Sequence, residues 1–168
     1  MSLASDIDTL IQQERRLHFK SFNEADAWAL GSKMRAVAEA RELPLVIDIR
    51  FKGRPLFYAA LPGTDADNPE WVRRKSNTTL RFFKSSYRYG RECVLKGQTP
   101  GPERGVDPMD FATAGGSFPI HLVGTGVVGA VTVSGIPQRD DHGFVCEMIC
   151  DFLGIDPATL MLPPETAD

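Results

Sequence analysis

Apolar residues near the start of the chain recur at the spacing of two helices. The first set is Leu3, Ile7, Leu10, Ile11 and Leu17. These positions share one side of a helical wheel, which predicts a helix over about residues 3–19. A second helix is expected to begin after Asn23, because Asn23 and Asp26 can accept hydrogen bonds from free first-turn amides. It should end before Pro44, since proline disfavours helix at the residue before it.

The period of the pattern then changes to two, which indicates β-strands. The first strand has the apolar positions Leu45, Ile47, Ile49 and Phe51. A second run over 56–61 follows the turn at 52–54 and predicts a hairpin. Three further β runs are expected near 111–114, 117–123 and 127–134. Because the turns between runs are short, these runs predict a five-stranded, mainly antiparallel sheet.

Two more helices are expected around this sheet. One begins at Asn68, where Asn68, Pro69 and Glu70 suit a helix start, and should run to about Gly90. On it, a basic face carries Arg73, Asn77, Arg81, Lys84, Arg88 and Arg91, and the opposite, core-facing side carries Val72, Thr79, Leu80, Phe83 and Tyr87. The last helix is expected to begin at Asp140 or Asp141 and to end before Gly154. The fold class predicted is α/β (α+β): one layered domain over residues 1–168, with helices on both faces of the sheet.

Composition narrows the classes of protein. The chain has 168 residues, no long apolar run and a start that lacks the pattern of a secretory signal, so we expect a cytoplasmic protein without a membrane partner. A net charge of −3 argues against a nucleic-acid binder. The charge is unevenly distributed, because residues 71–91 are basic and residues 138–168 are mostly acidic. These segments should attract each other, within one subunit or between subunits of a homo-oligomer.

Two motifs are better explained by structure than by chemistry. Residues 124–129 match the letters of a dinucleotide fingerprint, but the residues that follow are β-branched and predict a strand, so a hairpin turn is expected. His142, Cys146 and Cys150 stand four residues apart on one helix. The outer two would lie about 12 Å apart along the axis, too far for one metal ion. We therefore expect no metal site there, and cysteines that pack as small apolar residues.

Five residues are the candidates for ligand binding: Lys75, Gly115, Gly116, Ser117 and His142. Lys75 leaves the basic face of its helix for an apolar flank, where a cation is costly unless a ligand or a carboxylate meets it. Gly115 and Gly116 would allow a ligand close to the backbone, or simply bend a strand. His142 lies in a first helical turn, as a site residue or as a surface histidine in a cap. We predict that the five residues converge on one pocket for an anionic group on an apolar ligand.

Several short segments together carry a resemblance to a known family. They are the residues 71–77, 85–86, 114–120, 129–135 and 141–142. With them, the chain from about Asn23 onward resembles the heme-degrading domain family, within it the branch labelled an uncharacterised protein family. The family includes heme-binding extracellular sensors, glycolate-operon proteins and the C-terminal domain of some corrinoid adenosyltransferases. The resemblance implies a profilin-like sandwich, a symmetric homo-oligomer and heme as the cofactor to consider.

Two classes of function follow. In the first, the chain is a small-molecule-binding protein for a tetrapyrrole or another anionic apolar ligand. Lys75 or the basic helix face would then meet ligand carboxylates, and His142 would act as a ligand or proton donor. In the second, it is a non-catalytic, homo-oligomeric interaction or scaffold protein.

Overall fold

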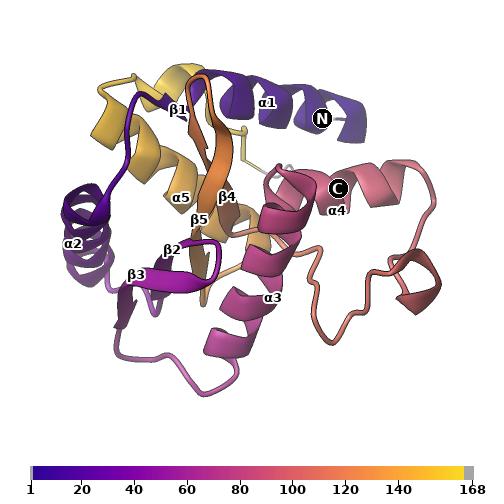
Figure 1. The fold of residues 1–168 in the computed structure, drawn as a ribbon, viewed down its shortest axis with the longest axis horizontal. Helices are drawn as coiled ribbons and strands as arrows, with labels where there is room; N and C mark the ends of the chain where they lie inside the picture. Colours follow the sequence, from indigo (N-terminus) through magenta and orange to yellow (C-terminus); the bar gives the residue numbers. More distant parts are fainter. Residues whose placement is uncertain (1, 165–168) are drawn as a thin grey trace.

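A mixed sheet forms the centre of the molecule (Figure 1). The computed structural model describes residues 2–164. The strands are β1 (His18–Phe19), β2 (Val46–Phe51), β3 (Arg54–Ala60), β4 (Ser117–Leu122) and β5 (Gly126–Ser134), in the spatial order β1-β4-β5-β2-β3. All neighbours pair antiparallel except β1 and β4, which are parallel. The predicted five-stranded, mainly antiparallel sheet is confirmed.

Helices cover both faces of this sheet. They are α1 (Leu3–Arg16), α2 (Glu24–Ala40), α3 (Asn68–Phe82), α4 (Ser86–Leu95) and α5 (Gln138–Leu153), with short 3-10 turns η1 (Pro102–Arg104) and η2 (Pro157–Thr159). Figure 1 shows α3 in front of β5 and α5 behind it, while α1 and α4 lie side by side. None of the helices in residues 2–164 combines the length and the apolar character that a bilayer crossing needs.

The two faces of the sheet differ in polarity. Ile47, Ile49, Val131 and Val133 point to the side of α2 and α5 and join the main apolar core. The alternate positions, facing α3, include the buried polar residues Asp48, Ser117, Thr132 and Ser134. From α3, Lys75, Ser76, Thr78 and Thr79 are buried as well. A polar layer therefore separates α3 from the sheet, whereas the other face is packed with hydrocarbon.

The predicted strand at 111–114 is wrong. Residues 111–116 form no strand, because the backbone of Ala112 forms its hydrogen bonds with α3. Its amide donates to the Arg74 carbonyl at 3.2 Å, and its carbonyl accepts from Thr78 Oγ1 at 2.7 Å. The fifth strand is instead β1, whose two residues are too few to show a period in the sequence. Consequently α1 ends at Arg16 rather than near residue 19.

The predicted single helix from Asn68 to Gly90 is also wrong. Phe83 adopts the left-handed conformation (φ 55°) and ends α3. Ser85 then caps α4, its hydroxyl accepting from the Arg88 amide at 3.2 Å. Because of this break Phe83 is 64% exposed and does not face the core as expected, whereas Tyr87 is buried.

The predicted start of α3 at Asn68 is confirmed. Its N-cap is Asp67, and the Asn68 side chain accepts from the Asp65 amide at 2.9 Å. Helix α5 begins at Gln138, slightly before the expected Asp140 or Asp141.

The start of α2 agrees with the sequence. The Asn23 side chain accepts from the amides of Ala25 and Asp26, and Asp26 accepts from the Asn23 amide at 2.9 Å. We expect Asn23→Ala to lower the free energy of unfolding by about 1 kcal/mol, since it leaves first-turn amides without a partner. Asn23→Asp keeps an acceptor and should stay close to wild type. Urea unfolding checks both variants, and equal losses in the two would contradict a capping role.

Candidate functional site

Lys75 of α3 and Asp141 of α5 form a buried ion pair across the end of β5. The Lys75 Nζ donates to Asp141 Oδ2 at 2.8 Å and to the Val133 carbonyl at 3.2 Å. The two side chains are only 3% and 2% exposed. Of the two partners that the sequence left open for Lys75, a ligand or a carboxylate, the chain itself supplies the carboxylate. Among residues 2–164, this is the ion pair that joins the basic 71–91 segment to the acidic C-terminal segment.

Burial moves both groups of this pair toward their neutral forms. It raises the pKa of Asp141 to about 6, against the opposing effect of the Lys75 charge. Burial likewise lowers the pKa of Lys75, and here the Asp141 carboxylate opposes the shift. The proton between Nζ and Oδ2 is thus held less firmly by the amine than it would be in water.

Gly116 brings the backbone close to this pair, and Gly115 brings it close to the start of α5. A Cβ on Gly116 would lie 2.5 Å from the Val133 carbonyl oxygen and 2.9 Å from Lys75 Nζ, and its φ of 127° suits glycine. A Cβ on Gly115 would lie 2.2 Å from the Gln138 carbonyl oxygen. The space that these glycines leave is filled by the protein's own chain.

Ser117 is buried in the polar layer. Its amide donates to Ser86 Oγ at 3.1 Å, and its hydroxyl accepts from Thr132 Oγ1 at 2.8 Å. Ser117 thereby links β4 to β5 and to the start of α4.

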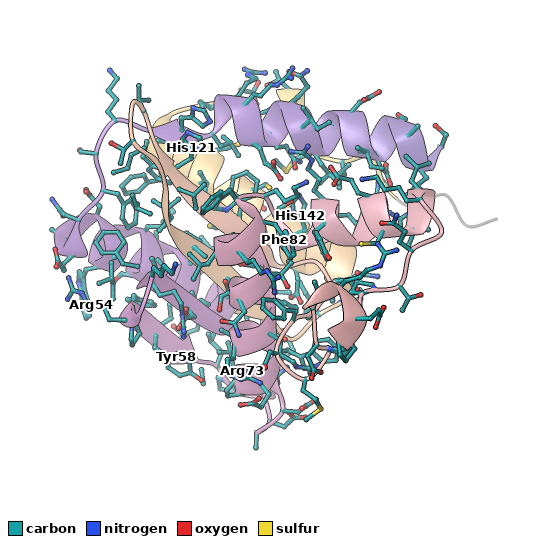
Figure 2. All side chains as sticks on the ribbon, turned by 45° about the vertical axis from the view of Figure 1, so that its right-hand side comes forward. Arg54, Tyr58, Arg73, Phe82, His121 and His142 are labelled. Carbon is teal, nitrogen blue, oxygen red and sulfur yellow. The ribbon has the colours of Figure 1, made fainter. Side chains whose placement is uncertain are left out.

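His142 lies in the interior, 1% exposed, between α1, α4 and β4 (Figure 2). Gln13 Nε2 donates to the Leu160 carbonyl at 2.8 Å, so Gln13 Oε1 faces His142 and accepts from its Nε2 at 2.8 Å. The Nδ1 atom is buried without a hydrogen-bond partner among the described residues. Burial, with the Arg139 charge, lowers the pKa of His142 to about 3, so the imidazole is neutral near neutral pH.

The structure brings some of the five candidates together and separates others. Lys75 and Asp141 line a depression of about 260 Å³ near the α5 start, and Gly116 lies beside the Lys75 amine. His142 and Ser117 are not among the residues that line this depression. One pocket shared by all five residues stays a prediction.

The histidines and cysteines form no metal cluster in the described part of the chain. His18 and His121 stack on each other across β1 and β4, with ring centroids 3.9 Å apart. Burial, and then the His18 charge, lower the pKa of His121. Cys146 Sγ lies 3.4 Å from His142 Nε2 inside the protein.

A larger pocket was not predicted from the sequence. It measures about 640 Å³ and lies between the β2–β3 hairpin, the end of α3 and the loop before β4. We call it the basic pocket; it is lined by Arg50, Lys52, Gly53, Asn77, Leu80, Arg81, Phe83, Asp110 and Phe111. The predicted continuous helix placed Phe83 in the core, which hid this pocket. Ser85, a good N-cap residue in the middle of that helix, was the signal that could have found the break.

The charges of the basic pocket are mostly positive. Arg50 is held by Asp48 through two hydrogen bonds of 2.6 and 2.8 Å. Lys52 and Arg81 form no ion pair with any carboxylate of residues 2–164. The Arg81 guanidinium lies 5.0 Å from the Phe111 ring centroid and donates to the Gly105 carbonyl. Two cations without carboxylate partners therefore border an apolar surface.

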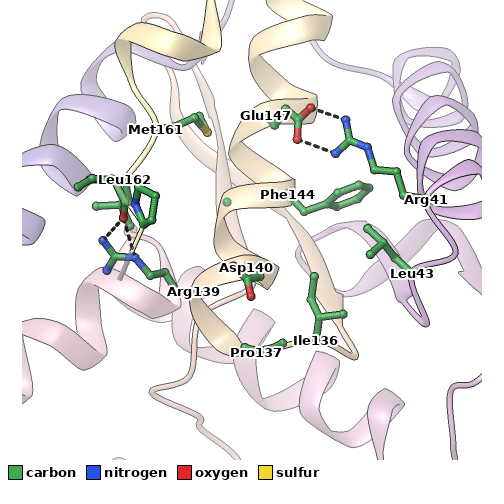
Figure 3. A pocket seen from close by; sticks show the side chains of 13 residues that line it. Arg41, Leu43, Ile136, Pro137, Arg139, Asp140, Phe144, Glu147, Met161 and Leu162 are labelled. Atoms are coloured by element: carbon green, nitrogen blue, oxygen red, sulfur yellow. Dashed lines mark hydrogen bonds and ion pairs between the residues drawn. The ribbon is translucent and has the colours of Figure 1, made fainter. Parts of the chain in front are cut away.

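A third pocket, of about 570 Å³, lies between α5 and the C-terminal segment (Figure 3). Both arginines that line it are already paired with groups of the protein. Arg41 binds Glu147 through two hydrogen bonds of 2.7 and 2.9 Å. Arg139 binds Asp6 at 2.8 Å and the Pro163 carbonyl at 2.7 Å. An anionic ligand would therefore find fewer free positive charges in this pocket than in the basic pocket.

Comparisons with known proteins agree on one family. The family described as "Haem degrading protein HbpS-like" matches residues 22–149. A "UPF0303 protein" of Acidobacterium capsulatum is 50% identical over 163 residues, 97% of this chain and 99% of that relative. The crystal structure of the Ybr137w protein is similar with a TM-score of 0.80 and 30% identity, covering 88% of this chain and 87% of that one. The PduOC:heme complex is similar in fold, with a TM-score of 0.64 and 17% identity over 82% of this chain and 96% of that one.

The buried His142 should make the protein sensitive to acid. Its folded pKa of about 3 lies below the ordinary 6.5, so protonation favours the unfolded chain. The stability that depends on a neutral imidazole is complete above pH 6.5 and is lost as the pH falls toward 3. Relative to His142→Asn, wild type should lose roughly 1.4 kcal/mol of unfolding free energy per pH unit in this window.

Urea unfolding of both proteins at a series of pH values measures this difference. The comparison is necessary because Asp141, whose pKa is raised to about 6, acts in the opposite direction as the pH falls. Parallel pH profiles for wild type and His142→Asn would show that His142 is not the group responsible.

Proposed function

The chain belongs to the family of HbpS-like heme-degrading proteins, and on that premise we propose that it binds a tetrapyrrole or another anionic, largely apolar ligand. The observation that carries this proposal is the basic pocket, where Lys52 and Arg81 border the apolar side chains of Leu80, Phe83 and Phe111. A pocket of about 640 Å³ is in the range of small-molecule and cofactor sites.

The fit of heme to this pocket has two parts, the fit of the organic ring with its carboxylates and the fit of the iron. Its macrocycle suits the apolar side chains, and its two carboxylates suit Lys52 and Arg81. Its iron finds no axial ligand, because the lining residues include no histidine, cysteine, methionine or tyrosine. The pocket fits the organic part of heme and not the metal. We therefore assign it recognition of the tetrapyrrole by charge and apolar contact.

Lys75 has a different role in this proposal from the one that the sequence suggested. Its charge is already met by Asp141, so it is poorly placed to hold a ligand carboxylate. The anion-binding role passes to Lys52 and Arg81, which extends the predicted basic face of α3 to the β2–β3 hairpin.

We further propose that the chain assembles with copies of itself. β3 lies at the edge of the sheet, and an unpaired edge is a template for another strand. Trp28, 67% exposed, packs on Phe57 at one side of this strand, and Tyr58, 50% exposed, lies on the other (Figure 2). A second copy would cover this apolar edge. The three free cysteines fit a cytoplasmic location, where thiols stay reduced.

Porphyrin titration tests the binding proposal. We expect hemin and metal-free protoporphyrin to bind with similar affinity, at one molecule per chain, because the pocket offers iron no ligand. The Lys52→Gln/Arg81→Gln variant should bind both at least about tenfold more weakly, since it loses two charged contacts. The matched control is Arg15→Gln/Lys20→Gln, which removes the same charge from two other exposed positions.

Absorbance and fluorescence titrations give the dissociation constants. Equal weakening in both double variants would mean general charge attraction rather than a pocket. Tight binding of hemin with none of protoporphyrin would place the ligand at an iron-binding group elsewhere.

Light scattering tests the assembly. We expect a mass several times the 18.5 kDa of one chain. Trp28→Glu/Tyr58→Glu should lower that mass, because charges placed along an edge strand oppose pairing. Val94→Glu changes an exposed apolar residue of α4, away from β3, and should leave the mass unchanged. A wild-type monomer would end the proposal.

A further inference from the structure

Lys75 is one of the residues that line the depression near the α5 start. Trp71, Ala114 and Ile136 form its apolar lining, and Asn68, Ser134 and Gln138 its polar lining. Lys75 and Asp141 line it as well, with the Nζ and Oδ2 atoms 2.8 Å apart. An amine and a carboxyl group are thus in direct contact beside a space of about 260 Å³.

Stability alone does not explain why this pair is buried. Taking two charges out of water costs free energy that their attraction often fails to recover, and apolar side chains of similar size pack at least as well. The cost is visible in the raised pKa of Asp141 and the lowered pKa of Lys75. Groups with such shifts beside a cavity are candidates for chemistry. Glycine at position 116, where a Cβ would lie 2.9 Å from Nζ, leaves room for the amine.

We propose that Lys75 is a nucleophilic amine that forms an imine with a small, uncharged aldehyde, and that Asp141 moves the proton in this reaction. This activity goes beyond tetrapyrrole binding and uses a different site, because none of the residues that line the depression lines the basic pocket.

Each step of the reaction balances with groups already present. Asp141 first takes a proton from the Lys75 ammonium, which leaves a neutral amine and a neutral carboxylic acid. The Nζ lone pair then attacks the aldehyde carbon, and a proton passes from the nitrogen to the carbonyl oxygen, which becomes the hydroxyl of a carbinolamine. Asp141 returns its proton to that hydroxyl, water leaves, and the nitrogen lone pair forms the C=N bond of a protonated imine. No oxidant or reductant is needed.

The lining selects the class of aldehyde. Among the residues that line the depression, Lys75 is the one cation, and the Lys75–Asp141 pair carries no net charge, so a carboxylate or phosphate on the substrate would lack a partner. Asn68, Ser134 and Gln138 can instead bind hydroxyl groups. A volume of about 260 Å³ lies just below the usual range for drug-sized ligands and suits a compound of a few carbons. The substrate class is therefore a short hydroxyaldehyde.

Reductive trapping tests the proposal. The protein is incubated with glyceraldehyde at about pH 7 and treated with borohydride, which delivers hydride to the imine carbon and fixes the adduct as a secondary amine. Peptide mass mapping then locates it. We expect labelling at Lys75 about tenfold faster than at the exposed Lys20 and Lys96, because a lower pKa gives more free amine at that pH. Pyruvate, which carries a carboxylate, should label Lys75 far less.

Two variants complete the experiment. Lys75→Met should lose the fast labelling and keep the slow labelling of the exposed lysines. Asp141→Asn keeps the Lys75 amine and removes the carboxylate that raises its pKa, so more free amine is present. Labelling should still slow by about tenfold or more, since the proton transfer that releases water is lost. Circular dichroism shows whether each variant folds. If Lys75→Met does not fold, the labelling rates of Lys75, Lys20 and Lys96 in the wild-type protein decide the question. Labelling of Lys75 no faster than that of Lys20 and Lys96 would overturn the proposal, whatever the porphyrin titration shows.

Discussion

The buried ion pair between Lys75 and Asp141 is the interaction on which the arrangement of this protein depends. It joins α3, on one face of the sheet, to the first turn of α5, which covers the other face, beside the end of β5. Removing one partner of such a pair leaves an uncompensated charge in the interior, which typically costs about 3–5 kcal/mol. The chain around it fits closely, because a Cβ on Gly116 would lie 2.9 Å from Lys75 Nζ and 3.2 Å from the Asp141 Cβ.

The polar layer under α3 follows from the same constraint. A cation on the buried side of a helix costs less in a polar layer than in a hydrocarbon core. Lys75 lies in such a layer, which includes the buried residues Ser117, Thr132 and Ser134 on the sheet and Ser76 and Thr78 on the helix. The main apolar core lies on the α2 and α5 face of the sheet, and it meets the depression at Ile136, which packs against the core and lines the depression. Two distinct chemical environments result on the α3 side: a small neutral-to-acidic depression at the α5 start, and a larger basic pocket at the other end of α3.

The sequence predicted features that rest on local patterns. The capping box at Asn23, the β2–β3 hairpin and the strands β4 and β5 all follow from short-range signals, and all are present. The cost of an unpartnered Lys75 also predicted a carboxylate or a ligand beside it. Local sequence patterns could not show that Asp141 would be that carboxylate, because Lys75 and Asp141 are 66 residues apart in the sequence. The basic pocket was missed for a related reason: it depends on the left-handed Phe83, which a helical period cannot reveal.

The fold holds Lys75 as an amine that gives up its proton more readily than a lysine in water. A carbon NMR titration of the Lys75 ε-methylene, in protein with labelled lysine and with the signal assigned by Lys75→Arg, measures this directly. We expect a pKa below the ordinary 10.5 in the folded protein, since burial outweighs the attraction of Asp141. A pKa at or above 10.5 would contradict it, and would make the pair a structural ion pair only.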